Sequence, residues 1–317
     1  MAAFLGQSVT TRTSAVTRLA RLALFGRTSG ARRRARGSTR AGRRAIGRGW
    51  VVATYVALVV FVLWTIIPFI WMILASVKTN REIYDDFTLL PKTLYFGHYV
   101  SLLGGKFGVW MRNSAEVSIA ATALSITLGA CGAYAITRLR FAGRRVIALG
   151  LVFTYLVPQS LLFIPLFQVV ASVGLSDTVG ALILVYPTIT LPFCTWLLMS
   201  YFKSIPLELE EAALIDGCNR LGVLLRIVLP LSTPALVVVC LFSFTQAWNE
   251  FLYALVITNS LATRTVTVGL TQMLGEDVFY WGQMMAGALI TALPPVLMYT
   301  LAQRLVIKGL IVGGVKG

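Results

Sequence analysis

Six long apolar stretches without a charged residue constrain this chain of 317 residues more than any other feature. A helix needs about 20 mainly apolar residues to cross the hydrocarbon core of a bilayer. The stretches cover residues 51–77, 117–137, 146–176, 178–202, 227–249 and 278–303. Lipid offers the backbone no hydrogen-bond partners, and these stretches lack the alternation of barrel strands. The sequence therefore predicts an all-α integral membrane protein with six transmembrane helices.

The composition excludes two other classes of protein. Hydrophobic residues make up 57% of the chain and charged residues only 13%, whereas soluble domains contain about 25% charged residues. A water-soluble globule and a disordered chain are both excluded. The net charge of +16 does not indicate nucleic-acid binding, because residues 1–50 alone contain 12 arginines and no acidic residue.

The distribution of Lys and Arg predicts the orientation in the membrane, because cytoplasmic connections carry an excess of both. If the N-terminus is cytoplasmic, the inner segments hold 22 of the 28 Lys and Arg residues. The short connection 138–145, with four arginines, is the strongest single anchor. We expect a multi-pass protein of the bacterial plasma membrane with both termini in the cytoplasm.

The chain lacks the residues that most catalytic and metal-binding sites require. His98 is the only histidine, so a His-based triad or a His-rich metal site is not expected. The four cysteines form no CxxC pair and indicate neither zinc nor a disulfide framework. The chain also lacks the GxxxxGK[ST] phosphate loop. We therefore expect no catalytic residue, no metal and no cofactor in this chain, which is not predicted to be an enzyme.

The connection 203–226 between the fourth and fifth stretches has the pattern of a short helix. Ser204 and Pro206 are residues that begin helices, and glutamates occupy the first turns, where the helix dipole favours them. Gly217 is a natural stop. Acidic residues outnumber basic ones over residues 203–220, whereas a helix lying on anionic lipid should be basic. A short helix that docks on a partner protein is therefore the better interpretation.

The same connection carries a specific motif. Glu211-Ala212-Ala213, three residues, Gly217, nine residues and Ile227-x-Leu229-Pro230 resemble the EAA motif of ABC-importer permeases in full spacing. The wider pattern is similar to the smaller permease of maltose-type, carbohydrate-class importers, over about residues 50–317. The resemblance implies the type I permease fold, with a cytoplasmic coupling helix.

The resemblance also implies partners. In such importers a homologous sister permease completes the pathway, two separate ATPase subunits bind ATP and Mg, and an extracytoplasmic solute-binding protein delivers the sugar. By match to the motif, the ATPase-coupling residues are Glu211, Ala212, Ala213, Asp216 and Gly217.

Two domains follow from this interpretation. Residues 50–317 form the permease domain, with the coupling loop at 203–226. Residues 1–49 form a basic, disordered cytoplasmic arm on anionic lipid. Their composition is also typical of a mitochondrial transit peptide, but the bacterial resemblance of the rest favours the arm.

Candidates for the substrate pathway lie near the end of the fifth stretch. Glu250 is the only ionisable residue deep in an apolar segment, which makes it a functional candidate by default. Trp248 offers a ring for stacking on a sugar, and Asn249 and Gln246 offer amides. The alternative for Glu250 is a structural cap near the membrane surface.

Two other functions compete with the sugar permease. An ion-coupled secondary transporter needs coupled intramembrane ionisable groups, and only Glu250 is available. A membrane-embedded enzyme needs paired acids, HExxH or a triad, none of which occurs in the spans.

Overall fold

The computed structural model describes residues 48–84, 88–273 and 280–314, and the described residues form helices and connections without a strand. The chain divides into two compact units, Met1–Phe69 and Ile70–Gly317. Of the predicted N-terminal arm, residues 1–47 lie outside the described residues, as do residues 315–317 of the C-terminal tail. We describe each unit by itself.

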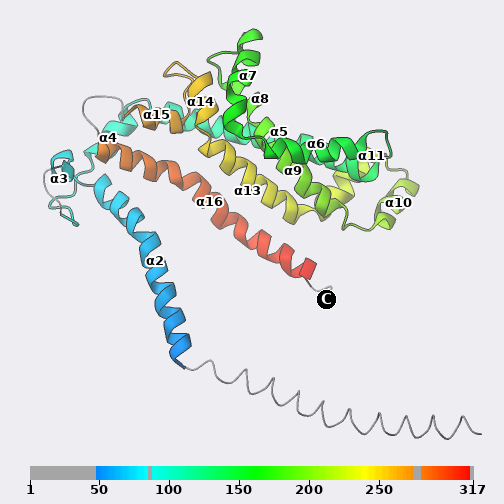
Figure 1. The fold of residues 1–317 in the computed structure, drawn as a ribbon, viewed down its shortest axis with the longest axis horizontal. Coiled ribbons are helices and arrows are strands. Elements are labelled where there is room, and N and C mark those ends of the chain that lie inside the picture. Colours follow the sequence, from blue (N-terminus) through cyan, green and yellow to red (C-terminus); the bar gives the residue numbers. More distant parts are fainter. Residues whose placement is uncertain (1–47, 85–87, 274–279, 315–317) are drawn as a thin grey trace, which may run out of the picture. The chain divides into compact units, whose positions relative to one another are not determined.

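Within the first unit the structure describes only residues 48–69, which make up most of helix α2 (Arg48–Ser76) (Figure 1). This helix is apolar on every side, and none of the residues in its most apolar window is buried. A helix that is hydrophobic all round needs an apolar environment instead of water. The first predicted span is therefore present as a continuous helix.

The second unit contains three more straight helical segments that are long and apolar enough to cross a membrane. These are α5 (Phe107–Arg138), α8 and α9 together (Val179–Val185 and Pro187–Phe202), and α16 (Trp281–Gly314). Two bent pairs of helices bring the candidate spans among the described residues to as many as six. The predicted fold class is confirmed, with two of the six predicted spans broken.

The first bent pair is α6 (Arg144–Leu156) and α7 (Gln159–Ser172), whose axes differ by 106°. The break falls at Val157 and Pro158, both in extended conformations. A proline disfavours the α region for the residue before it, so Val157 cannot continue the helix easily. The stretch 146–176 is therefore two helices.

The second bent pair joins the coupling loop to the fifth span. It consists of α11 (Arg220–Val223), the π-helical turn η1 (Leu224–Val228), α12 (Leu229–Leu231) and α13 (Thr233–Asn249). The bend of 84° falls at Ser232, just before α13. A proline near the start of α13 suits a helix beginning, because its missing N–H is not needed there.

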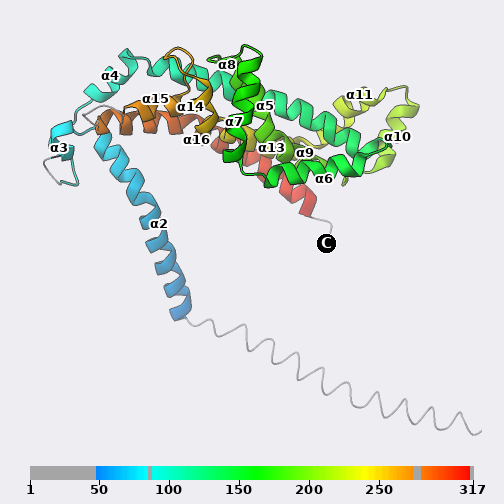
Figure 2. The ribbon, with the colours of Figure 1, turned by 45° about the horizontal axis from the view of Figure 1, so that its top comes forward.

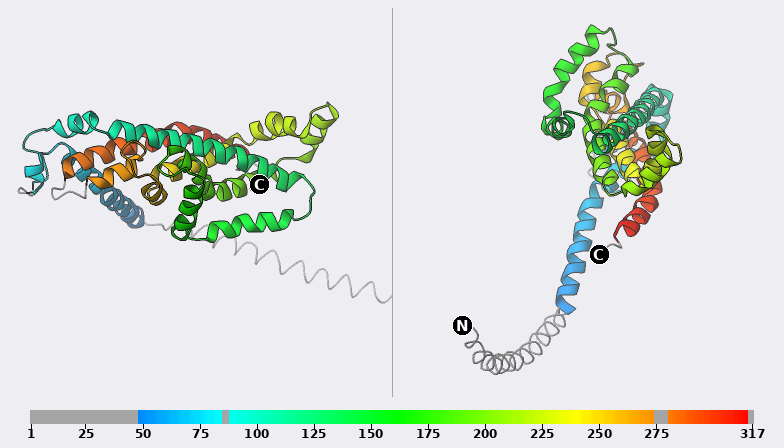
Figure 3. Two further views of the ribbon diagram at one scale, coloured as in Figure 1. Left: turned by 90° about the horizontal axis from the view of Figure 1, so that it is seen from above. Right: turned by 90° about the vertical axis from the view of Figure 1, so that its right-hand side faces the viewer.

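Helix α5 is the central element of the second unit and packs along both α9 and α13 (Figures 2 and 3). Small residues make the approach to α9 close, since a Cβ added at Gly129 comes within 3.2 Å of the Cβ of Cys194. Ala133, one turn further on, is completely buried. Small residues on this face of α5 therefore let the two helices pack closely.

The connections gather at the two ends of α5. The coupling-loop helices α10 (Leu207–Ile215) and α11 lie near its C-terminal end (Figures 1 and 2). Toward its N-terminal end lie α4 (Gly97–Gly104), α14 (Leu252–Ile257) and α15 (Val266–Gln272). The short helix α3 (Asn80–Tyr84) precedes α4.

Candidate functional site

Helix α10 begins and ends where the sequence predicts. Pro206 precedes it, and Glu208 and Glu210 lie in its first turn. At its end, Gly217 has a φ of 88°. The N–H of Cys218 donates to the carbonyl of Ala213 at 3.0 Å, and that of Gly217 donates to Leu214 at 3.1 Å. This pair of bonds is a Schellman motif, which needs a residue with positive φ at the position of Gly217.

The predicted coupling residues divide between the two faces of α10. Glu211, Ala212, Asp216 and Gly217 are exposed and lie at the surface of the chain. Ala213 is buried and belongs to the apolar cluster around α5 and α9. The four exposed residues are available to a partner protein, whereas the methyl group of Ala213 packs within this chain.

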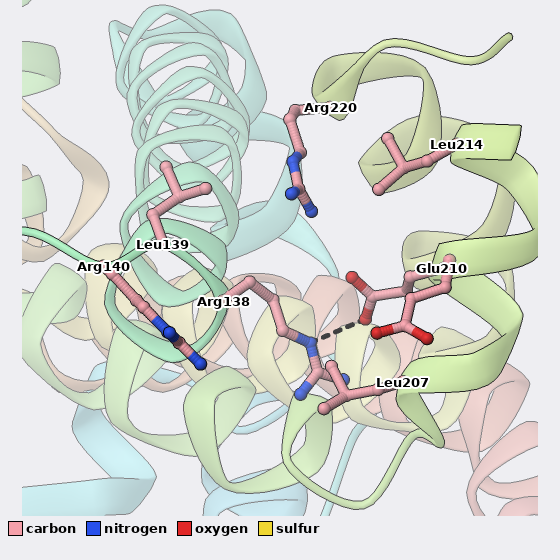
Figure 4. A pocket seen from close by; sticks show the side chains of 8 residues that line it. Arg138, Leu139, Arg140, Leu207, Glu210, Leu214 and Arg220 are labelled. Carbon is pink, nitrogen blue, oxygen red and sulfur yellow. Dashed lines mark hydrogen bonds and ion pairs between the residues drawn. The ribbon is translucent and has the colours of Figure 1, made fainter.

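A buried ion pair holds the inner face of α10 against the end of α5. The Nε of Arg138 lies 2.6 Å from Oε1 of Glu210, and the two side chains are only 7% and 2% exposed (Figure 4). The hydroxyl of Tyr134 donates to Oε2 of the same glutamate at 3.3 Å. A charge-assisted bond in a buried site is strong only when each partner is well satisfied.

Arg138 also reaches the end of α9. Its Nη2 donates to the carbonyl of Phe202 at 2.7 Å and to that of Ile205 at 2.9 Å. The last carbonyls of a helix lack partners within the helix, and a basic side chain there also complements the helix dipole. One arginine therefore connects α5, the end of α9 and α10.

A pocket of about 410 Å³ opens beside this ion pair (Figure 4). Arginines and glutamates line it together with leucines of α10. Leu207, Glu211 and Leu214, which helical spacing places on one face, all line it. Among the sequence-predicted coupling residues, Glu211 is the one that contributes to this pocket.

Sequence reasoning missed the partners on the inner face. It used Arg138 as a positive charge that fixes orientation, and Glu210 as a residue favourable to the helix dipole and as part of the acidic charge of the loop. The available signal was the spacing of Glu210 and Ala213, which puts the glutamate on the same face as a small apolar residue. Finding Arg138 as its partner required the tertiary packing of α5 against α10.

The structure places Trp248 in a packed position. The indole is 2% exposed, and its N–H donates to the carbonyl of Thr291 in α16 at 3.0 Å. The ring stacks on Phe244, with centroids 5.4 Å apart. In this arrangement Trp248 joins α13 to α16.

Glu250 lies at the break between α13 and α14. Its two carboxylate oxygens accept the N–H groups of Tyr253 at 2.9 Å and Ala254 at 3.1 Å. A carboxylate in front of a helix satisfies N–H groups that have no partner within the helix. The structure thus gives Glu250 the geometry of a cap. Asn249 beside it is exposed, and Gln246 is partly buried.

The connection 258–265 is tied to the N-terminal part of α5. Trp110 donates to the carbonyl of Leu261 at 3.1 Å, and Asn113 donates to that of Ala262 at 2.7 Å. Asn113 reaches a second carbonyl in the connection, that of Arg264, at 3.0 Å. These bonds use only backbone groups of the connection.

Asp177 holds the same connection from the loop before α8. Its Oδ1 accepts the N–H groups of Asn259 at 2.8 Å and Ser260 at 3.0 Å, together with the hydroxyl of Thr263. Desolvation favours a raised pKa for this carboxyl group, but these hydrogen bonds outweigh it and lower the pKa to about 2. The carboxylate is therefore charged at physiological pH.

The described residues form a helical membrane protein with anchored connections at the two ends of α5. Residues 121–312 match the family described as the binding-protein-dependent transport system inner membrane component. The chain belongs to this family, whose members are permease subunits of ABC importers and not catalytic subunits. Family membership favours the permease subunit of an ABC importer over an ion-coupled transporter. It also makes the chain a multi-pass membrane protein.

Named relatives cover most of the chain. The inner membrane ABC transporter permease protein YcjP of Escherichia coli is 40% identical over 84% of this chain and 96% of its own length. The trehalose/maltose transport system permease protein MalG of Thermococcus litoralis is 35% identical over 79% of this chain and 91% of its own.

The fold has a solved counterpart. A chain of a bacterial ABC transporter that imports the acidic polysaccharide alginate superposes with a TM-score of 0.72 at 24% sequence identity. The match covers 81% of this chain and 96% of that one. At this identity the likeness shows the fold alone.

Proposed function

We propose that this chain is the permease subunit of an ATP-driven sugar importer and that α10 is its coupling helix. The single observation that carries the proposal is the exposed face of α10, where Glu211 and Ala212 lie in the EAA spacing and a Schellman motif sets the end of the helix. Family membership supports it, as do relatives named as trehalose/maltose, trehalose and arabinooligosaccharide permeases.

The proposed assembly has five subunits of four kinds, counting this chain. A homologous sister permease completes the pathway, two ATPase subunits bind ATP and Mg beneath the membrane, and an extracytoplasmic solute-binding protein delivers the sugar. Both termini, α10 and the arginine-rich connection after α5 face the cytoplasm in this orientation. The exposed glutamate Glu211 offers the ATPase a charge-assisted hydrogen bond, and Ala212 permits close approach.

We further propose that the sugar pathway passes the end of α13, near Gln246, Trp248, Asn249 and Glu250. Asn249 is exposed and offers its amide to a sugar hydroxyl. The indole N–H of Trp248 and the carboxylate of Glu250 already have partners within the chain. These two residues therefore shape the pathway mainly by holding α13 and α14, and Asn249 is the residue best placed for direct contact.

A pull-down from native membranes tests the assembly. The tagged chain is isolated in mild detergent, and every retained protein is identified by mass spectrometry. We expect an ATPase, a second permease and a solute-binding protein in fixed ratio, and the binding protein is then screened against a panel of oligosaccharides. A chain that is recovered alone, or only with copies of itself, contradicts the proposal.

A further inference from the structure

The connection that leads into α10 differs physically from the one that leads out of it. On the entry side, Arg138 holds the carbonyls of Phe202 and Ile205, so both ends of the short segment 203–204 are fixed to α5. On the exit side, the chain turns at Gly217, passes a π-helical turn and bends by 84° before α13. A π-helical turn is a local departure from regular helix geometry. The entry side is held by hydrogen bonds to α5, whereas the exit side is bent and packs Val223, Leu224 and Val228 into the apolar cluster that contains Ala213.

All side-chain hydrogen bonds and ion pairs that join α10 to α5 in the described part of the chain run through one residue, Glu210. Its neighbours on the same helix face either the solvent or the apolar cluster that contains Ala213. Apolar contacts have no direction and allow one surface to slide on another, whereas a short ion pair fixes distance and orientation. Glu210 therefore determines how α10 is oriented on α5.

We propose that Arg138 and Glu210 make α10, the C-terminal end of α5 and the end of α9 into one rigid body that transmits ATPase motion to the membrane spans. Both are positioning residues, because neither is offered to the ATPase or to the sugar. The inference rests on the proposed coupling role of α10 and adds the element within this chain that receives the motion. When a partner displaces the exposed face of α10, the clamped entry side carries α5 and α9 with it.

A distance measurement on the assembled complex tests this rigid body. One spin label is attached at Ile215, an 86% exposed residue of α10, and a second at Leu128, an exposed residue of α5. Labelled complexes that still retain the ATPase are compared without nucleotide and with ATP, Mg²⁺ and vanadate. We expect the wild-type chain to give one narrow distance that is the same in both states. A wild-type distance that changes with nucleotide overturns the inference.

The variants sharpen the same test. In Arg138→Gln we expect the distance between the two labels to shift or broaden on addition of ATP, Mg²⁺ and vanadate. We also expect the coupling between ATP hydrolysis and the conformational change of the spans to weaken about fivefold or more. A merely stabilising pair gives equal broadening with and without nucleotide. Arg145→Gln removes the same charge from an exposed residue at the start of α6 and should behave as wild type.

Failure of the inference differs visibly from failure of the proposed function. If no ATPase is retained by the wild-type chain, the function is wrong. If the ATPase is retained and Arg138→Gln gives the wild-type distances in both states, the rigid body is wrong. Glu210→Gln keeps the size of the side chain and removes its charge, so it serves as the second variant if Arg138→Gln does not assemble.

Discussion

The two ends of α5 hold the neighbouring connections by different means. At the C-terminal end, Arg138 fixes α10 through an ion pair with Glu210, in addition to its bonds to the carbonyls of Phe202 and Ile205. At the N-terminal end, Trp110 and Asn113 fix a connection through its backbone carbonyls. Anchoring through the backbone leaves the side chains of the connection free to vary, whereas anchoring through an ion pair fixes the identity of both residues. The difference predicts where the chain tolerates substitution.

The largest expected effect is at the ion pair. Arg138→Gln leaves Glu210 buried without its cationic partner, which costs about 3–5 kcal/mol when one member of a buried pair is removed. We expect a clear fall in the midpoint of thermal unfolding of the purified chain in detergent. Arg145→Gln is the matched control, and a shift as large in the control as in Arg138→Gln contradicts the special role of the buried pair.

Reversing the charge on the exposed face of α10 should affect partner binding and not the fold. In Glu211→Lys we expect at least a tenfold loss of retained ATPase, since losing one partner of a hydrogen-bonded charge pair costs about 2–5 kcal/mol of binding. Thermal unfolding of the chain should stay near wild type. Glu208→Lys makes the same charge change in the preceding turn, and equal loss of ATPase in both variants argues against a specific contact at Glu211.

Truncation at the N-terminal end of α5 should loosen the connection 258–265. Asn113→Ala removes two hydrogen bonds that the buried Asn113 side chain donates to backbone carbonyls, and should cost about 1–3 kcal/mol. Amide hydrogen exchange is the measurement, and we expect faster exchange in residues 259–266 with unchanged exchange in α10. Equal acceleration at both ends of α5 shows that the two anchors are not independent.

The anchor at Asp177 predicts a pH dependence. Hydrogen bonds lower the pKa of its carboxyl group to about 2 in the folded chain, against about 3.9 in an unfolded one. Its contribution is therefore fully present above about pH 4 and is lost as the pH falls toward 2. Protection of the Asn259 and Ser260 amides against hydrogen exchange should be constant from about pH 5 to pH 8 and decline only below that range. In Asp177→Asn this decline should be absent. If protection in the wild-type chain is lost with a midpoint near neutral pH, the Asp177 carboxylate is not the anchor.

The smallest expected effect is on side chains of the connection itself. Ala262 and Leu261 contribute carbonyls to the anchors, so Ala262→Ser should change stability by no more than about 0.5 kcal/mol. Measuring thermal unfolding of Ala262→Ser and Asn113→Ala side by side compares the two changes in stability directly. A large loss in Ala262→Ser means that the side chain, and not the carbonyl, makes the important contact.

The spans could be predicted from the sequence because charge-free length is a local property. The stretch 178–202 coincides with α8 and α9 within a residue at its start. Bends could not be placed so well, since apolar character continues through them. Pro158 gave a signal for the first bend, and Pro230 and Pro234 flank Ser232 at the second, but neither signal fixes the size of the bend.

The candidate site was predictable where a motif identified it and not where packing created it. Glu211 and Gly217 follow from the EAA spacing, and helix α10 from its start and stop residues. Arg138 and Glu210 are 72 positions apart in the chain, so their pairing depends on how α5 and α10 meet. Trp248 shows the converse difficulty, because an aromatic ring in a span has the same sequence pattern whether it packs on Thr291 or contacts a sugar.

Site-directed cross-linking tests the central claim most directly. A photoreactive residue at Ala212, on the exposed face of α10, is compared with one at Leu261, an exposed residue near the other end of α5. The account predicts that in native membranes Ala212 cross-links to an ATPase subunit and that Leu261 does not. An ATPase captured from Leu261, or a chain that captures no ATPase from Ala212, contradicts the assignment of α10 as the coupling helix.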